Sequence, residues 1–350
     1  MRSVSGTLNT AQLMSTPYRT PYIHMLFTSY DGNTTYDFST DSAAYGNRIL
    51  LIDHYEQSYN DYATVILKNH DKLLTTLDLR GYWVEIGYGD TTGGGNEYAA
   101  TPRLWVKSQQ LISLAGNLLM VLTLEGMWSK LSETLFRVGS PPFFTTTYTA
   151  ETVYAILSAL LTEAGFTLNA LGGVDDGIIN SYTPNFTIND FQRFESGAEI
   201  LYRLIKMTYC YLRPLVSLEF KVVHPQAADA VDITYHNYKA PYFYEYAEYL
   251  NLVVPNVIYL FANAGADGLW TGILAATATD TDSQGMYGDV PTIELAPEIT
   301  GQSEADNRAA VILARLKNES MAGVLIVPHD CRVELYDRIQ VKDSRGATQT

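Results

Sequence analysis

Apolar and polar residues alternate through most of the first 125 residues, and this period of two predicts β-strands. Asp31-Gly32-Asn33 and Ala115-Gly116-Asn117 lie between such segments and are typical of tight hairpin turns. Residues 1–20 are polar and show no periodicity, which predicts a flexible or partner-ordered arm. Many strands joined by short turns favour a barrel or a sandwich. We expect strands at residues 22–29, 34–38, 48–57, 59–68, 82–88, 104–111 and 118–124.

The period changes to that of a helix after residue 148. An apolar stripe follows, with Thr149 as its expected N-cap and Gly165 as its expected end. Ser196 and Glu199 form a capping-box pattern that predicts a second helix reaching about Met207. Segments 208–212 and 217–223 then predict a hairpin, so this part reads as a small α+β unit. The stripe consists of Val153, Ile156, Leu157, Leu160, Leu161 and Ala164.

The last third predicts further strands around one long helix. Ser303 is its expected N-cap, and apolar residues recur at helical spacing to residue 320. Glu304 with Arg308, and Arg315 with Glu319, lie one turn apart and predict charge pairs on the exposed side. No returning strand is expected after the turn at 343–346, which suggests a truncated chain or an edge supplied by a partner. The strands are expected at 231–235, 257–261, 273–279, 324–327 and 334–341.

Composition narrows the function classes. The 350 residues are 47% hydrophobic and 17% charged, which is typical of a folded protein of two or three domains. The net charge of −15 disfavours direct binding to nucleic acid, because such binding needs clustered Lys and Arg. Residues 224–300 contribute ten acidic residues and one basic residue, Lys239. Two cysteines, Cys210 and Cys331, make a disulfide framework improbable, and no apolar run predicts secretion or membrane insertion.

Four patterns suggest chemistry, and none is complete. Gly93-Gly94-Gly95 lacks the Lys-Ser/Thr of a phosphate loop and predicts a mobile hairpin loop. Asp280 and Asp282 match the start of a calcium loop, but Pro291 stands where a bidentate Glu is needed. The six histidines share no metal-binding spacing. The carboxylate pairs of a glycan hydrolase would be Asp53 with Glu56, or Asp175 with Asp176, yet nothing selects them. We therefore predict no enzyme, no metal and no cofactor.

A dense run of aromatic residues surrounds Pro241 and is the candidate interface. Tyrosine is abundant in the whole chain, with 26 copies, and suits surfaces where a ring is buried while its hydroxyl finds a partner. Stacking on sugars is the alternative for this run. Its members are Tyr235, Tyr238, Tyr242, Phe243, Tyr244, Tyr246 and Tyr249.

The C-terminal motifs resemble those of baseplate and tail hub proteins of tailed bacteriophages, the late-control-D-like family. They are Met286-Tyr287-Gly288 before an alanine-rich helix, then Val327-Pro328-His329, Glu334-Leu335-Tyr336-Asp337 and Val341-Lys342-Asp343. The resemblance implies an α+β fold with two tail-tube-like β-barrel domains and an inserted small helix-containing α+β domain. The implied boundaries are an arm at 1–20, a barrel at 21–146, the insertion at 147–225, and a second barrel at 226–350 with a helix at 303–320.

The resemblance also implies a function. The chain would be a structural virion protein, a trimeric hub that joins the tail tube to the tail tip and lines the DNA passage. Its partners would be the tail tube, distal tail and tip or spike proteins, with assembly in the host bacterial cytoplasm. DNA would pass without specific binding. The alternatives are a tail-tip cell-wall hydrolase or glycan-binding protein, and the hub of a phage-like contractile injection system.

Overall fold

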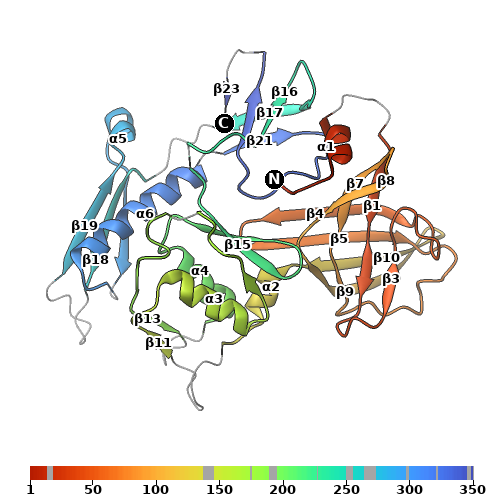
Figure 1. Cartoon of the computed structure of the whole chain (residues 1–350), viewed down its shortest axis with the longest axis horizontal. Helices are drawn as coiled ribbons and strands as arrows, with labels where there is room; N and C mark the ends of the chain where they lie inside the picture. Colours follow the sequence, from red (N-terminus) through yellow and green to blue (C-terminus); the bar gives the residue numbers. More distant parts are fainter. Residues whose placement is uncertain are drawn as a thin grey trace.

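A computed structural model describes most of the chain and confirms the α+β class. Figure 1 shows the N-terminal strands on one side, the helical part below the centre, and a C-terminal sheet with a long helix on the other side. The described residues are 1–13, 19–136, 146–173, 176–188, 195–226, 228–249, 255–263, 273–296, 299–320, 322–344 and 348–349.

The N-terminal unit contains two sheets, of seven and three strands, around one apolar core. The chain crosses between the sheets at Met25 and again at Ile86, and both side chains are buried in that core. Among the described residues the strand order β3-β2-β6-β9-β10-β5-β4 stays open at both ends, so no closed barrel forms there. The strands are β1 (Pro21–His24), β2 (Leu26–Thr28), β3 (Thr35–Asp37), β4 (Ile49–Gln57), β5 (Asn60–Lys68), β6 (Trp83–Val84), β7 (Gly87–Thr92), β8 (Gly95–Ala100), β9 (Leu104–Leu114) and β10 (Asn117–Glu125).

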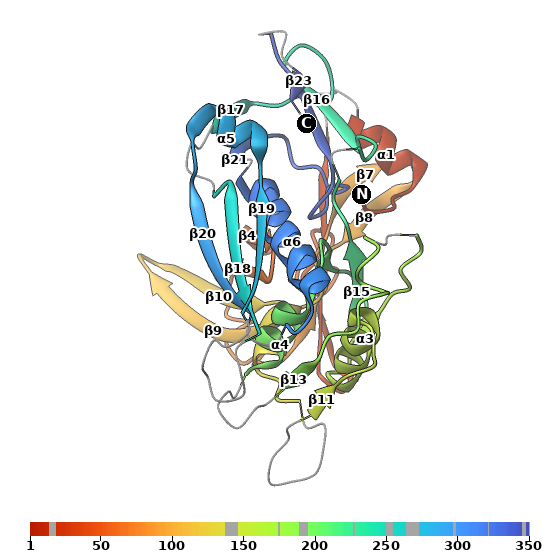
Figure 2. The same cartoon turned by 90° about the vertical axis from the view of Figure 1, so that its left-hand side faces the viewer.

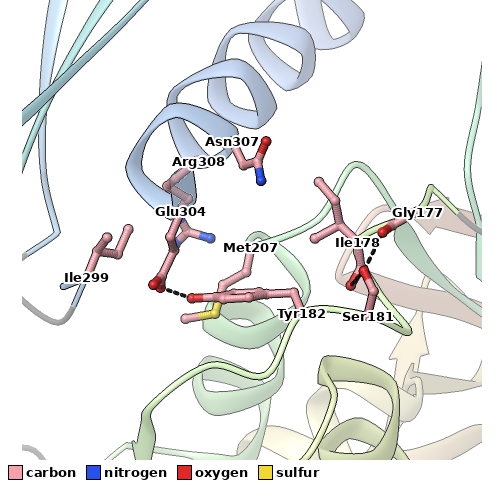
Figure 3. A pocket seen from close by; sticks show the side chains of 9 residues that line it. All are labelled: Gly177, Ile178, Ser181, Tyr182, Met207, Ile299, Glu304, Asn307 and Arg308. Atoms are coloured by element: carbon pink, nitrogen blue, oxygen red, sulfur yellow. Dashed lines mark hydrogen bonds between the residues drawn. The ribbon is translucent and has the colours of Figure 1, made fainter. Parts of the chain in front are cut away.

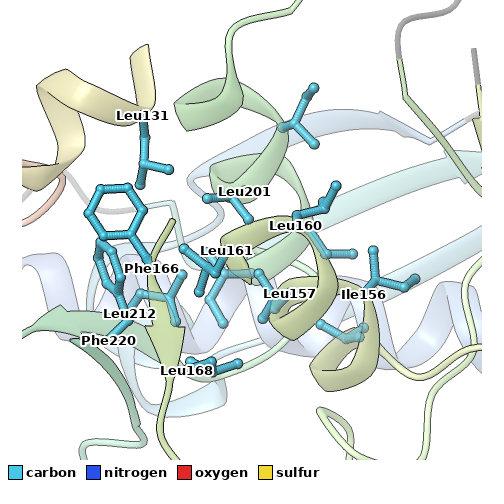
Figure 4. Packing of buried hydrophobic residues seen from close by; sticks show 14 of the residues in the cluster. Leu131, Ile156, Leu157, Leu160, Leu161, Phe166, Leu168, Leu201, Leu212 and Phe220 are labelled. Carbon is cyan, nitrogen blue, oxygen red and sulfur yellow. The ribbon is translucent and has the colours of Figure 1, made fainter. Parts of the chain in front are cut away.

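The middle unit is built on three helices. The Ser196–Glu199 capping box is confirmed, whereas the first predicted helix is capped by Thr152 rather than Thr149. Figure 4 shows part of its core, where Leu157 and Leu161 of the first helix belong to one buried cluster with Leu201 and Phe220. The elements are α2 (Met127–Ser132), β11 (Thr146–Tyr148), α3 (Val153–Glu163), β12 (Thr167–Leu168), β13 (Phe186–Ile188), α4 (Gly197–Ile205), β14 (Tyr211–Pro214) and β15 (Glu219–Val223).

The C-terminal unit places α6 against one face of the sheet β19-β18-β20. Ala305 and Ala309 of α6 are fully buried against Ile258 and Leu260 of that sheet. Figure 2 views the opposite face of the same sheet. The elements are β16 (Ile233–His236), β17 (Glu245–Tyr249), β18 (Val257–Ala262), β19 (Leu274–Thr279), α5 (Thr281–Tyr287), β20 (Pro291–Ala296), α6 (Gln302–Ser320), β21 (Ala322–Ile326), β22 (Ile339–Lys342) and β23 (Thr348–Gln349).

The first residues of the chain differ from the predicted flexible arm. They form helix α1 (Gly6–Leu13), and Leu8 is buried with Ala99 and Cys331. The backbone N–H of Arg2 donates to the carbonyl of Arg332 at 2.7 Å. This segment is held in place by residues that are distant in the sequence, so no local periodicity predicts its structure.

The C-terminal strands also differ from the prediction. Residues Glu334–Asp337 form a turn, and the strand is limited to β22. Both expected strands have partners within the chain, because β21 pairs with β17 while β22 lies between β16 and β23. The expectation of a missing returning partner was therefore wrong.

Candidate functional surfaces

The aromatic run divides into buried and exposed members. Tyr235 in β16 is only 2% exposed, and its hydroxyl donates to Asp330 Oδ2 at 2.9 Å. Burial, followed by the charge of Asp330, raises the pKa of the Tyr235 hydroxyl. Tyr238, Tyr242 and Tyr244 are exposed large side chains. These three residues form what we call the aromatic surface.

The rest of the run supports this surface. Phe243 and Tyr246 are half-buried and meet edge to face, with ring centroids 6.4 Å apart. The backbone N–H of Tyr244 donates to the carbonyl of Ile326 at 2.7 Å, which holds the segment against β21. The side chain of Tyr249 lies outside the described residues. One core tyrosine and three surface tyrosines therefore come from a run that looks uniform in sequence.

Arg315 joins the three units and was missed by sequence reasoning. The helical period placed it on the exposed side of α6, but its residue is only 8% exposed. Its guanidinium donates to the carbonyls of Thr208 at 3.0 Å and Cys210 at 2.9 Å, and to the hydroxyl of Tyr59 at 2.9 Å. The same group lies 4.3 Å from the ring centroid of Tyr211. A single side chain of α6 thus contacts the middle unit and the β4–β5 turn.

A second group of charges joins the same three units near the N-terminus. Arg2 pairs with Glu56 of β4 at 2.5 Å. Arg213 of β14 pairs with Glu334 at 3.3 Å and with Asp337 at 3.2 Å. We call these five residues the charge junction. Ion pairs with these arginines hold Glu334 and Asp337 in a turn, where a strand was predicted.

A pocket separates the middle unit from the start of α6. Figure 3 shows Tyr182 reaching Glu304, and the Tyr182 hydroxyl donates to Glu304 Oε1. The cavity has a volume of about 200 Å³. Met207 and Ile299 add apolar walls. Glu304, predicted to pair with Arg308 along its own helix, thus contacts another unit of the chain.

The residues considered for chemistry have structural partners. Glu56 belongs to the charge junction, and Asp53 lies exposed on β4. Asp176 accepts hydrogen bonds from the backbone N–H groups of residues 178, 179 and 209, and Asp175 lies outside the described residues. Glu56 and Asp176 are therefore engaged in structural contacts.

The partial calcium motif forms a helix start. Asp280 caps α5 by accepting from the backbone N–H of Ser283, and it pairs with Lys317 at 2.8 Å. The hydrogen bond from Lys317 lowers the pKa of Asp280. Gly93 and Gly94 connect β7 to β8 as the turn of a paired hairpin. No helix among the described residues has both the length and the apolar content needed to cross a membrane.

Comparison with known proteins defines the class of fold. The chain matches no protein-family model and no curated protein sequence. Solved structures do resemble it. A tail protein from Neisseria meningitidis MC58 superposes with a TM-score of 0.63 at 12% identity, covering 94% of this chain and 89% of that one.

Two further structures share the same architecture. The 43 kDa tail protein of prophage MuSo2 from Shewanella oneidensis gives a TM-score of 0.61 at 14% identity, with 93% and 89% coverage of the two chains. The prophage tail protein gp18 from Listeria monocytogenes EGD-e gives 0.52 at 11% identity, with 93% and 87% coverage. The chain therefore has the fold of phage tail proteins, and the resemblance inferred from the C-terminal motifs is confirmed at the level of the fold.

Proposed function

We propose that this chain is a structural protein of a phage-type tail, the hub that joins the tail tube to the tail tip. The observation that carries the proposal is the match in fold to tail proteins over more than nine-tenths of the chain. The role is non-enzymatic, and the described carboxylate candidates Asp53, Glu56 and Asp176 support this because each has a structural partner. The chain belongs to the virion tail after assembly in the bacterial cytoplasm.

The proposed architecture has two tail-tube-like β units, at residues 21–146 and 226–350, with the insertion at 147–225 between them. Three chains would present six such units and match a sixfold tube to a threefold tip. The partners are the tail tube, the distal tail and the tip or spike proteins. The net charge of −15 supports a DNA passage with acidic walls, because such walls repel phosphates and offer no site for specific binding.

The aromatic surface is the proposed contact between copies. Tyrosines at an interface bury large rings at low entropic cost and keep a hydroxyl for hydrogen bonding. Tyr238, Tyr242 and Tyr244 are exposed in the single chain, whereas Tyr235 already has its partner inside it. Among the members of the run whose side chains the structure describes, these three rings are the exposed ones.

Size-exclusion chromatography with light scattering tests the proposal. The wild-type chain should have three times the mass of one chain, and replacing the three exposed tyrosines by serine should give single chains. The matched control is Tyr30→Ser, because Tyr30 is 92% exposed in the β2–β3 turn and far from the aromatic surface in sequence. A wild-type chain that stays monomeric at every concentration and salt would contradict the trimer, and an unchanged triple variant would contradict the assigned surface.

A further inference from the structure

The sheet β19-β18-β20 has one covered face and one open face. Ile258 and Leu260 point toward α6 and are fully buried. Side chains alternate along a strand, so Tyr259 and Phe261 point to the opposite face. The parallel register pairs Tyr259 with Ile293 and Phe261 with Leu295, so all four apolar residues share this side. We call these four residues the open face; it looks toward the viewer in Figure 2.

The open face is unusually apolar for a solvent-facing sheet. A sheet packed on one side normally carries polar side chains on the other. Here Ile293 is 64% exposed and Leu295 is 62% exposed, and both lie on the edge strand β20. Exposed apolar residues also occur on α5, which follows β19, at Met286 and Tyr287. Exposed apolar side chains gathered on one face of a sheet mark a binding site.

The charges beside the open face have one sign. The sequence contains no Lys or Arg between Lys239 and Arg308. Asp282 is exposed on α5, and Asp289 is exposed just before β20. A partner that covers the apolar residues therefore lies close to carboxylates. Lys and Arg side chains on that partner would increase its affinity.

We propose that the open face binds a different protein through an apolar strand flanked by Lys and Arg. A second copy that docks here face to face is a poor occupant, because Asp282 and Asp289 would then lie opposite the same two carboxylates of the other copy. Copies meeting here would place like charges together, which costs affinity. Among the described residues β20 is an edge strand, so an extended segment can add to the sheet there. The inference does not depend on the proposed tail role.

Fluorescence anisotropy with a labelled peptide of alternating lysine and valine tests this inference on the full chain. The peptide should bind, and its affinity should fall as salt rises because the flanking charges are screened. The variant Ile293→Ser/Leu295→Ser should weaken binding at least tenfold. The control Leu111→Ser/Leu114→Ser removes a similarly exposed apolar pair, 47% and 64% exposed, from β9 and should bind like wild type. A peptide with glutamate in place of lysine should not bind.

Three outcomes would overturn the inference. One is equal loss of binding in both double variants, which would mean non-specific adsorption. Another is binding that survives Ile293→Ser/Leu295→Ser in a chain whose circular dichroism melt is unchanged. The third is self-association of the wild type, seen by light scattering, that this variant abolishes while the β9 control does not. That result would identify a second copy as the occupant.

Discussion

Replacing Arg315 by methionine should loosen the contact among all three units of the chain. The guanidinium donates to the carbonyls of Thr208 and Cys210 and to the hydroxyl of Tyr59, at 2.9–3.0 Å. Hydrogen bonds of a charged group contribute about 1.5–3 kcal/mol each, although they do not add. Methionine leaves the two carbonyls buried without their donor while it keeps some packing on Tyr211. Since an unsatisfied buried acceptor costs about 1–3 kcal/mol, we expect a loss of about 2–5 kcal/mol in the free energy of unfolding.

Urea unfolding followed by tryptophan fluorescence measures the total loss. Because a chain of several units need not unfold in one step, hydrogen exchange of residues 205–211 provides the local measurement. Exchange there should accelerate in Arg315→Met. The control is Arg80→Met, because Arg80 is an exposed arginine paired with exposed Asp78, and its loss should leave both measurements unchanged.

The reasoning fails if Arg315→Met is as mild as Arg80→Met. A finer test uses Tyr59→Phe, which removes one hydroxyl acceptor and should cost about 0.5–1.5 kcal/mol. The double variant should lose less than the sum of the two single losses, because both changes remove the same bond. Strict additivity would show that the Arg315–Tyr59 contact contributes nothing.

Three further predictions follow from buried or tightly packed groups. Arg213→Met should cost about 1–3 kcal/mol in urea unfolding, because the buried Asp337 carboxylate loses its guanidinium and keeps only the N-terminal ammonium of Met1, at 2.9 Å; a change near zero would contradict this. Burial raises the pKa of Asp61 from 3.8 to about 7, so stability should fall as pH rises from about 4 to 7. The free energy of unfolding of Asp61→Asn should therefore exceed that of wild type by up to about 4 kcal/mol at pH 8, but not at pH 4. An equal difference at both pH values would refute this prediction. Gly89→Ala should cost about 1–3 kcal/mol in the same assay, since its Cβ would lie 1.9 Å from a carbonyl oxygen of β8, whereas Gly93→Ala meets open space and should be neutral.

Elements with strong local signals were predictable. The Ser196 capping box and the apolar stripe of α3 depend on residues within a few positions of each other, and the structure confirms both helices. Strands β4 and β5 also lie within two residues of their predicted bounds. Local propensity and tertiary packing agree in these places, which is when sequence patterns succeed.

Elements ordered by distant contacts were not predictable. Helix α1 has a weak apolar period, and its position depends on Arg2 and Leu8 reaching residues more than 90 positions away. The alternating pattern at 334–341 predicted a strand, but ion pairs to Arg2 and Arg213 hold Glu334 in a turn. Tertiary interactions overrode the local preference in both segments.

The inward position of Arg315 also could not be predicted from local sequence. The spacing of Arg315 and Glu319 is that of an exposed pair along a helix, and nothing local distinguishes it from an inward-facing arginine. Arg315 points inward because the backbone carbonyls at the end of α4 have no partner within the helix and accept hydrogen bonds from its guanidinium. Those carbonyls lie more than 100 residues earlier in the chain. Arg315 is held by backbone carbonyls, which every residue has, so no acidic residue in the sequence marks its partners. This contact among the three units could therefore not be predicted from the sequence.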